Sequence, residues 1–309
     1  HGVYNYIEWN CAMKLKDFLQ DEGLVRLGKG LGKNLSLRGI RRLANFVSGI
    51  LNRYPKNQMR RVIKGNLSVV LDEEANSDII NALSKEVIRN LMWTHADYFY
   101  LYQHPEESKS AIEFSSNALE MIEDVRERRQ PTVICGPHYG NFDLLGLSLA
   151  RKSVPMMVLS VPNPQGTYSA QNEMRNKSGM NVRPIDMKAI RDAKKFLLEG
   201  NAVVTGIDRP VEDPKNAKYK PLFFGKPAAL PVFYTRFGLE EGVKLRVAYC
   251  KRKSDGRYIV DCSAPVEMRQ YDDLKEEYEK NAQATLREAE KIIRKEPEHW
   301  LMLHPVWEK

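Results

Sequence analysis

From about residue 126 onward, short apolar runs alternate with longer amphipathic stretches along the chain. Runs of four to six apolar residues predict buried strands, and apolar positions three or four residues apart predict helices packed against them. Gly200 closes one of these helical stretches, as expected of a helix C-terminal stop. The predicted strands are 132–135, 155–160, 182–185 and 202–207, and the predicted helices are 143–152, 168–178 and 188–199.

Two further segments, 243–249 and 257–262, alternate apolar with polar residues. The turn sequence Ser254-Asp255-Gly256 lies between them, which predicts a β-hairpin. A charged amphipathic stretch at 274–294 predicts a long helix. Strands that alternate with helices pack as a sheet covered by helices, so the fold class is predicted to be α/β, with a mixed sheet flanked by helices.

The first part of the chain lacks this alternation and is predicted to be mostly helical. Leu24, Leu27, Leu31 and Leu35 recur at near-helical spacing, and residues 78–102 form an amphipathic run rich in aromatic side chains. Such an aromatic stripe is usually core, but it also fits a membrane interface or an acyl channel. We therefore predict a helical N-terminal region at 1–125, with a membrane-contacting surface as one interpretation, and an α/β core at 126–309.

The chain carries 48 Lys and Arg against 40 Asp and Glu, a net charge of +8. A basic balance favours anionic partners such as nucleic acid, anionic lipid headgroups or an acidic carrier protein, or it simply keeps the protein soluble. No nucleic-acid-binding motif is present, so no nucleic-acid partner is expected. The densest basic stretch fits either a solvated helix face or a contact with anionic lipid; it comprises Arg38, Arg41, Arg42, Arg53, Lys56, Arg60, Arg61 and Lys64.

The four cysteines have no spacing typical of a metal site or of a disulfide scaffold. We therefore expect no metal, and reduced thiols in a cytoplasmic setting. Cys135 lies in a predicted buried strand, which favours packing over nucleophilic chemistry. No run of about twenty apolar residues occurs, so no segment is expected to span a bilayer. The first residue is not Met, which fits removal of an upstream segment.

The candidate chemistry follows the strand predicted at 132–135. His138 comes directly after Gly136-Pro137, and Asp143 stands on the first turn of the next predicted helix. Histidine exchanges a proton near neutral pH, and a carboxylate on its other ring nitrogen would fix its tautomer. The alternative interpretation is a loop histidine with Asp143 as a helix N-cap.

The turn around His138 also has features that suit a ligand site. Ligands of α/β proteins bind beyond the carboxyl ends of the strands. Gly136 and Gly140 flank the histidine and leave room for a substrate near the backbone. A tetrahedral oxyanion would need donors, either the backbone N–H groups of residues 136–141 or a cation.

The segment HYGNFD at 138–143 resembles the H-x4-D/E signature of the bacterial lipid A biosynthesis acyltransferases, which are related to the glycerolphosphate acyltransferases. Other segments resemble the same family, in the same order, from about residue 24 to the C-terminus. The tail departs from the family in having Pro305-Val306-Trp307 where a pair of arginines is usual, and the chain lacks the usual opening membrane-spanning helix. The similar segments are Arg60–Leu67, Met174-Arg175 with Gly179 and Val182, Asp208-Arg209, Phe223–Gly225 with Leu230-Pro231, and Glu298–Trp300 with His304.

The resemblance implies a glycerolphosphate-acyltransferase-like fold and an O-acyltransferase. The acyl donor would be a thioester of acyl carrier protein or coenzyme A, with no other cofactor, and the acceptor a hydroxyl of a membrane glycolipid such as a lipid A precursor. His138 would be the general base, oriented by Asp143, in a peripheral enzyme at the cytoplasmic face of the inner membrane. The implied substrate-binding residues are Arg209 for a phosphate, Asp208 for orienting Arg209 or a sugar hydroxyl, Arg175, Asn141, Gly140, Glu298 and His304.

Two other functions stay open from the sequence. The same histidine and aspartate would serve a lipid or ester hydrolase, although neither a G-x-S-x-G turn nor a metal-ligand set is present. A basic lipid-binding protein without catalysis would account for the charge alone.

Overall fold

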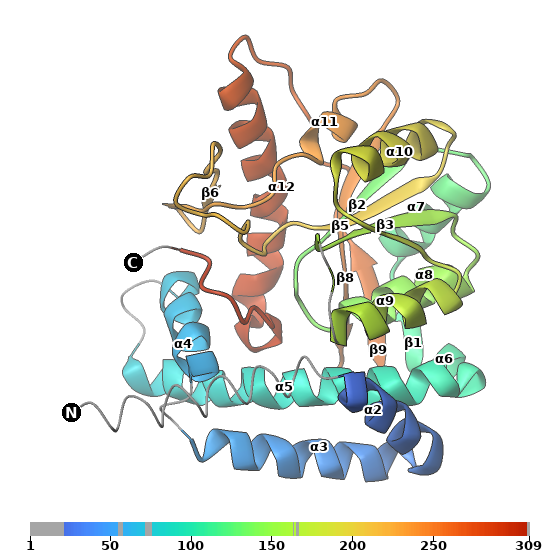
Figure 1. Ribbon diagram of the computed structural model, residues 1–309, viewed down its shortest axis with the longest axis vertical. Helices are drawn as coiled ribbons and strands as arrows, with labels where there is room; N and C mark the ends of the chain where they lie inside the picture. The colour runs from blue at the N-terminus through green and yellow to red at the C-terminus, as the bar shows by residue number, and fades with distance from the viewer. Residues whose placement is uncertain (1–21, 55–57, 72–75, 163, 165–166, 308–309) are drawn as a thin grey trace.

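The computed structural model describes residues 22–54, 58–71, 76–162, 164 and 167–307. Its centre is a seven-stranded mixed sheet in the order β1-β9-β8-β2-β5-β3-β4 (Figure 1). The predicted α/β class with a mixed sheet flanked by helices is confirmed. The strands are β1 (Ile112–Phe114), β2 (Thr132–Gly136), β3 (Met156–Ser160), β4 (Asn181–Pro184), β5 (Ala202–Gly206), β8 (Lys244–Arg252) and β9 (Tyr258–Cys262).

The central strands are parallel because each predicted strand is followed by a crossover helix. β2 pairs in parallel with both β5 and β8, and β5 pairs with β3. The predicted hairpin is confirmed, since β8 and β9 are antiparallel. The crossover helices are α8 (Phe142–Arg151), α9 (Thr167–Lys177) and α10 (Met187–Leu198).

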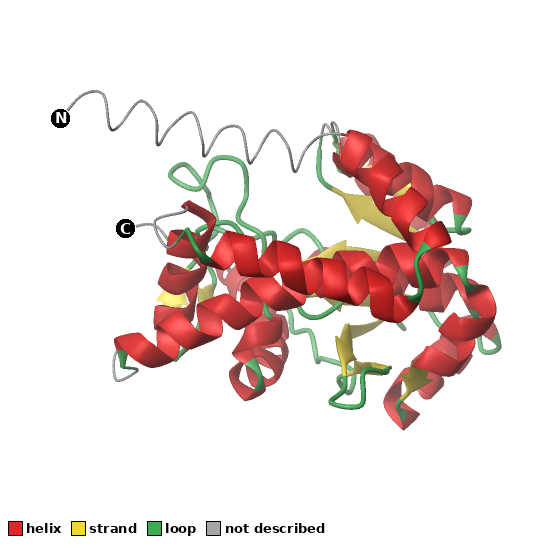
Figure 2. Cartoon of the chain, turned by 90° about the horizontal axis from the view of Figure 1, so that it is seen from below, coloured by secondary structure: helices red, strands yellow, loops and turns green. Residues whose placement is uncertain are grey.

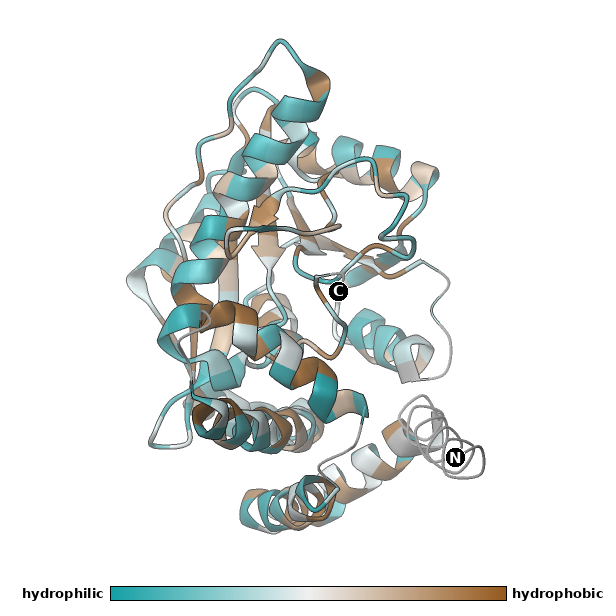
Figure 3. Ribbon diagram, turned by 90° about the vertical axis from the view of Figure 1, so that its left-hand side faces the viewer, coloured by the Kyte–Doolittle hydropathy of each residue, from teal (hydrophilic) through white to brown (hydrophobic). Residues whose placement is uncertain are grey.

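Alternation along the strands gives the sheet two apolar faces. Ile134 of β2 belongs to the core beneath α8, whereas Val133 and Cys135 belong to the opposite core beneath α10 and α12 (Leu274–Lys295). In Figure 3 the strands between the helical layers are correspondingly brown, the colour of apolar residues. The sheet is therefore buried on both sides, and its carboxyl edge is left for a site.

A layer of N-terminal helices lies along one side of the molecule, as Figure 2 shows from below. The 27-residue α5 is its long axis, and α2, α3 and α4 pack on it. Gly32 of α2 lies so close to α5 that an added Cβ would come within 2.5 Å of the Phe99 carbonyl oxygen. The helices are α2 (Glu22–Asn34), α3 (Leu37–Asn52), α4 (Gln58–Val70), α5 (Ser77–Gln103), α6 (Pro105–Ala111) and α7 (Ser116–Arg126).

The N-terminal helices and the sheet are joined by shared structure. β1 lies within the first 125 residues, yet it pairs with β9 at the sheet edge. The division at residue 125 stays a prediction. The remaining elements are β6 (Leu222–Phe223), β7 (Lys226–Pro227), α11 (Thr235–Gly238) and η1 (Pro297–His299).

The C-terminal tail after η1 is held by α4. The side-chain amide of Asn66 donates to the carbonyl oxygens of Met302 and His304, and its carbonyl accepts from the Val306 N–H. The Arg60–Leu67 motif therefore anchors the tail beside the sheet. Across the described part of the chain, no helix combines the length and the apolar character needed to cross a membrane.

Candidate functional site

The candidate site lies where β2 and β5 end side by side. The two strands are parallel, and their last paired residues are Gly136 and Gly206. His138 and Asp208 each come two residues later, so the sheet register places them next to each other. The two residues are 70 positions apart in sequence.

Asp208, rather than Asp143, holds the His138 ring. The Nδ1 atom of His138 lies 2.6 Å from the Oδ1 atom of Asp208. The Oδ2 atom of Asp208 accepts from the His138 backbone N–H at 2.8 Å and from Nε1–H of Trp300 at 2.7 Å. A carboxylate can only accept, so Nδ1 carries the proton and Nε2 is left as the free base.

Asp208 has no exposed surface, so its negative charge is stabilised by these three donors. The His138 side chain keeps 27 % of its surface exposed. The imidazole is therefore held from the protein side and accessible on the other. This is the arrangement that a general base requires.

The prediction that Asp143 orients His138 is wrong. Asp143 stands in the first turn of α8, and its Oδ1 atom accepts from Nε of Arg175 at 2.8 Å in a buried ion pair. Arg175 also donates to Oδ1 of Asn172 at 2.7 Å. Burial lowers the pKa of the Arg175 guanidinium, but the charge and hydrogen bond of Asp143 outweigh this effect and raise the pKa overall.

Two further side chains from α5 surround Asp143. Burial lowers the pKa of His95, and the nearby charge of Asp143 opposes that shift. Burial also raises the pKa of Tyr98, with Asp143 adding to the effect. The Tyr98 hydroxyl has no hydrogen-bond partner among the described residues. Sequence reasoning missed both residues as neighbours of Asp143, because no local motif connects α5 to α8.

The backbone N–H groups of residues 138–141 are already engaged, which corrects their assignment as oxyanion donors. The His138 N–H binds Asp208, and the Tyr139 N–H binds the Pro137 carbonyl. The next two N–H groups bind the carbonyls of His299 and Cys250. Of the donors considered from the sequence, a cation is left.

Gly140 and Asn141 shape the loop from within. Gly140 has φ +65°, and an added Cβ would lie 2.2 Å from the Cys250 carbonyl oxygen. The buried Asn141 side chain caps α8 through the Leu144 N–H and donates to the Thr94 carbonyl of α5. Both residues thus fix the conformation that presents His138. Their direct contact with substrate stays a prediction.

Space is open beside the imidazole on the β5 side. A Cβ on Gly206 would lie 3.6 Å from Cε1 of His138, so the glycine leaves this edge of the ring uncovered. The Phe142 ring meets the imidazole edge-on, with ring centroids 5.2 Å apart. A substrate would therefore meet the ring between a glycine and an aromatic wall.

Arg209 follows Asp208 in the chain and is partly exposed. One of its terminal nitrogens donates to the Tyr168 hydroxyl at 2.9 Å, and the guanidinium lies over the Tyr168 ring. α9 thus orients Arg209 on the same side of the sheet edge as the candidate base. No bond between Asp208 and Arg209 is present, so the predicted orienting role of Asp208 toward Arg209 is replaced by its role toward His138.

The C-terminal tail enters the site through a residue that sequence reasoning did not select. Trp300 donates to Asp208, and the Leu301 N–H donates to the His138 carbonyl at 2.7 Å. Glu298 and His304 are represented here by backbone carbonyls, which accept from Asn90 and Asn66. The tail motif therefore contributes its tryptophan, and substrate contacts by Glu298 and His304 stay predictions.

The remaining sequence candidates have structural positions. Cys135 is fully buried, and burial raises the pKa of its thiol well above the usual range, which suits packing. Cys11 lies outside the described residues. Phe223 and Phe224 are buried beside Trp300. Within the described ranges, no group of three or more His, Cys, Asp and Glu side chains has the geometry to hold a metal ion.

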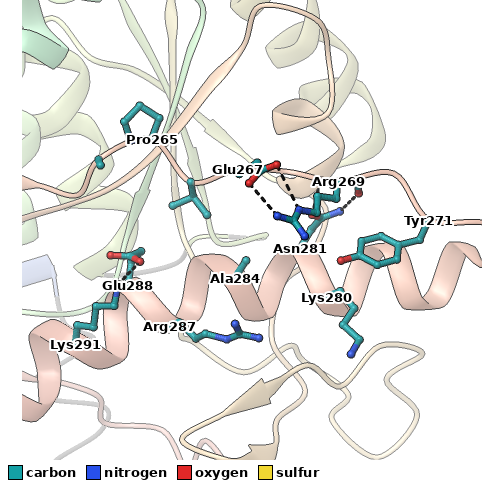
Figure 4. Close-up of a pocket in the computed structure, with 12 residues that line it drawn as sticks. Pro265, Glu267, Arg269, Tyr271, Lys280, Asn281, Ala284, Arg287, Glu288 and Lys291 are labelled. Carbon is teal, nitrogen blue, oxygen red and sulfur yellow. Dashed lines mark hydrogen bonds and ion pairs between the residues drawn. The ribbon is translucent and has the colours of Figure 1, made fainter.

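A groove of about 550 Å³ lies elsewhere, between α12 and the segment that follows β9 (Figure 4). The segment's Val266 N–H binds the Leu245 carbonyl, and Leu245 pairs with Val133 near the start of β2. The groove is therefore near the amino edge of the sheet, opposite His138. Its lining includes Lys280 and Arg287 and none of the residues that contact His138.

Comparison with known proteins yields one match. Residues 24–309 match the family described as bacterial lipid A biosynthesis acyltransferase. A search of curated proteins finds no match. The matched region includes both strand ends, the Asp208-Arg209 pair and the tail with Trp300.

Proposed function

Because the chain belongs to the bacterial lipid A biosynthesis acyltransferase family, we propose that it transfers a fatty acyl chain from an acyl thioester to a hydroxyl of a membrane glycolipid such as a lipid A precursor. The observation that carries this proposal is the His138 imidazole, held at Nδ1 by the buried Asp208 and accessible at its other edge. A substrate hydroxyl can then supply the nucleophile.

In the proposed reaction, Nε2 of His138 takes the proton of the acceptor hydroxyl as its oxygen attacks the thioester carbonyl carbon. The new C–O bond gives a tetrahedral intermediate with a negatively charged oxygen. When this intermediate collapses, the C–S bond breaks and the electron pair leaves with sulfur. His138 returns its proton to the thiolate, so the products are an ester and a thiol.

Asp208 contributes by holding one tautomer and by stabilising the imidazolium that forms during attack. Its full burial strengthens that interaction, because little water competes for the charge. Trp300 and the His138 backbone N–H keep the second carboxylate oxygen in place. The dyad of His138 and Asp208 thus replaces the local pairing with Asp143 that the motif suggested.

We assign binding of an acceptor phosphate to Arg209. A guanidinium donates two parallel hydrogen bonds to phosphate oxygens, and Arg209 is partly exposed with Tyr168 fixing one nitrogen. Arg175 is the weaker candidate, because Asp143 and Asn172 already engage its nitrogens in a buried position. The donor is a thioester of acyl carrier protein or coenzyme A, and the enzyme works peripherally at the cytoplasmic face of the inner membrane.

The experiment follows a labelled acyl chain. Purified protein is incubated with labelled acyl carrier protein, or separately with acyl-CoA, and a phosphorylated lipid A precursor in detergent. Label in the lipid, absent with His138→Ala, supports the transferase. Label released as free acid would favour a hydrolase, and no turnover with lipid binding retained would favour a binding protein. Unchanged transfer by folded His138→Ala would overturn the mechanism.

A further inference from the structure

The positive charge of this protein is concentrated in one segment. Residues 23–71 contain eleven Lys and Arg and no Asp or Glu. The whole chain has a net charge of +8, so everything outside this segment carries a net charge of −3. The basic character therefore belongs to α2, α3 and α4 and the segments that join them, and not to the sheet that forms the candidate site.

α3 combines this charge with exposed apolar side chains on its outward face. Ile40, Ala44 and Ser48 are buried toward the rest of the protein. On the opposite face Phe46 is 66 % exposed, Ile50 is 40 % and Leu43 is 36 %. At 100° per residue these three side chains lie within one 60° sector of the helix.

The neighbouring sector of the same face is basic. Arg38, Arg42 and Arg53 are all exposed, and the structure gives none of them a carboxylate partner among the described residues. Their directions fall beside that of Phe46, on the side away from Leu43. One face of α3 thus presents an apolar strip and a parallel row of unpaired guanidinium groups.

This face is rigidly connected to the candidate site. The opposite side of α3 is fixed to α5 by the ion pair of Arg41 with the fully buried Asp97, at 2.8 Å. α5 in turn accepts a hydrogen bond from Asn141 of the His138 loop through the Thr94 carbonyl. In Figure 1, α3 forms the outer layer beneath α5, so a single helix layer separates the two.

We propose that this face of α3 docks on an anionic lipid bilayer, with Phe46, Leu43 and Ile50 entering the interface and Arg38, Arg42 and Arg53 contacting lipid phosphates. The inference rests on the proposed function, because it names the surface from which the site receives its acceptor. Docking on α3 holds α5 and the carboxyl edge of the sheet at a fixed distance from the lipid headgroups.

The pairing of features favours lipid over a carrier protein. An acidic protein is complementary to the arginines but gives no reason to leave a phenylalanine two-thirds exposed in the same face. A bilayer surface is complementary to both, since it offers phosphates at the surface and acyl chains just below. The absence of any acidic residue across the whole segment also removes repulsion from the anionic surface.

The test measures partition of the full chain onto vesicles of phosphatidylcholine alone and of phosphatidylcholine mixed with phosphatidylglycerol. Each basic residue near an anionic surface contributes roughly fivefold to binding, so the triple variant Arg38→Gln, Arg42→Gln, Arg53→Gln should bind the mixed vesicles on the order of a hundredfold less well. Lys188→Gln, Arg191→Gln, Lys195→Gln on α10 removes equal charge and should change binding little.

The apolar strip is tested by Ile50→Glu, with Leu198→Glu on α10 as its matched control. The two side chains are 40 % and 47 % exposed, so neither change disturbs a core. Ile50→Glu should weaken binding about tenfold or more, and Leu198→Glu should bind as the unaltered chain does. Near-UV circular dichroism establishes that each variant is folded.

Outcomes separate this inference from the proposed function. The α3 variants should keep acyl transfer to acceptor dispersed in detergent micelles and lose it on vesicles. Vesicle binding that survives both α3 changes would overturn the docking surface and leave the dyad chemistry untouched. Loss of binding to acyl carrier protein, or of self-association, with vesicle binding intact would assign the face to a protein partner instead. Vesicle binding without transfer in any format would refute the proposed function alone.

Discussion

Replacing Asp208 by Asn tests the candidate dyad most sharply, because the surrounding donors decide how the amide must sit. In the protein, Oδ2 accepts two N–H bonds, from Trp300 and from the His138 backbone, whereas Oδ1 faces Nδ1. The one carbonyl of Asn satisfies the two N–H donors only at the Oδ2 position. Its NH2 group then faces Nδ1 of His138.

That orientation reverses the histidine tautomer. An NH2 group can only donate, so Nδ1 must accept and the ring proton moves to Nε2. His138 then has no lone pair to offer the acceptor hydroxyl. The corresponding change in a Ser-His-Asp triad lowers kcat by ~10⁴, and we expect a loss of about 10³ to 10⁴ here, equivalent to roughly 4 to 5.5 kcal/mol in the barrier.

The matched control is Asp143→Asn, which leaves every contact of His138 in place. It removes the partner of the buried Arg175 and should destabilise the fold by about 3 to 5 kcal/mol. In a chain of this size that shift is on the order of 10 °C in Tm. Both variants are assayed for acyl transfer below their Tm. A folded Asp208→Asn variant with near-normal kcat, beside an inactive Asp143→Asn variant, would refute the reasoning.

Three further outcomes are expected from other parts of the fold. Gly140→Ala should lower transfer at least tenfold, because its Cβ meets a carbonyl oxygen at 2.2 Å, whereas Gly225→Ala, at φ +73° with open space, should leave transfer within about twofold; equal effects would contradict this. Gly32→Ala should lower Tm, whereas Gly30→Ala, which meets nothing within 4 Å, should raise stability by up to ~1 kcal/mol, and differential scanning calorimetry distinguishes them. Burial lowers the pKa of His299 from 6.5 to about 4, so the unfolded chain binds the proton first and stability should fall by roughly 3 kcal/mol as pH drops from 6.5 to 4; His299→Gln should flatten that slope in urea titrations, and an unchanged slope would contradict it.

The sheet was largely predictable from the sequence because its central strands are buried on both faces. Such strands are continuous apolar runs, and the runs at 132–135 and 202–207 correspond to β2 and β5 within one residue. β1 was not predicted, since three residues are too short to show a period. Its existence depends on pairing with β9, which lies more than 140 residues further along the chain.

The candidate site was predicted only in its local half. His138 follows a recognisable strand and turn, but its carboxylate partner is set by which strand lies beside β2. That neighbour is β5, and the register Gly136 to Gly206 brings Asp208 to the ring. The nearby Asp143 matched the spacing, yet Arg175 of α9 engages it. Strand order and long-range ion pairs are tertiary properties that periodicity does not encode.

Trp300 illustrates the same limit from the other end of the chain. Its segment matched the family pattern, but nothing local indicates that an indole N–H reaches Asp208 across 92 positions. The tail arrives there because Asn66 of α4 holds it and because Tyr139 and Trp300 form a β-bridge. The signal available in sequence was a tryptophan within an otherwise polar terminal motif.

The protonation of His138 itself tests the central claim most directly. Selective ¹⁵N labelling of the six histidines, with His138→Gln to assign the signal, reports which ring nitrogen carries the proton at neutral pH. The dyad with Asp208 predicts a protonated Nδ1 and an unprotonated Nε2, reversed in Asp208→Asn. A proton on Nε2 in the unaltered protein would contradict the account, because that nitrogen could not then accept the proton of an acceptor hydroxyl.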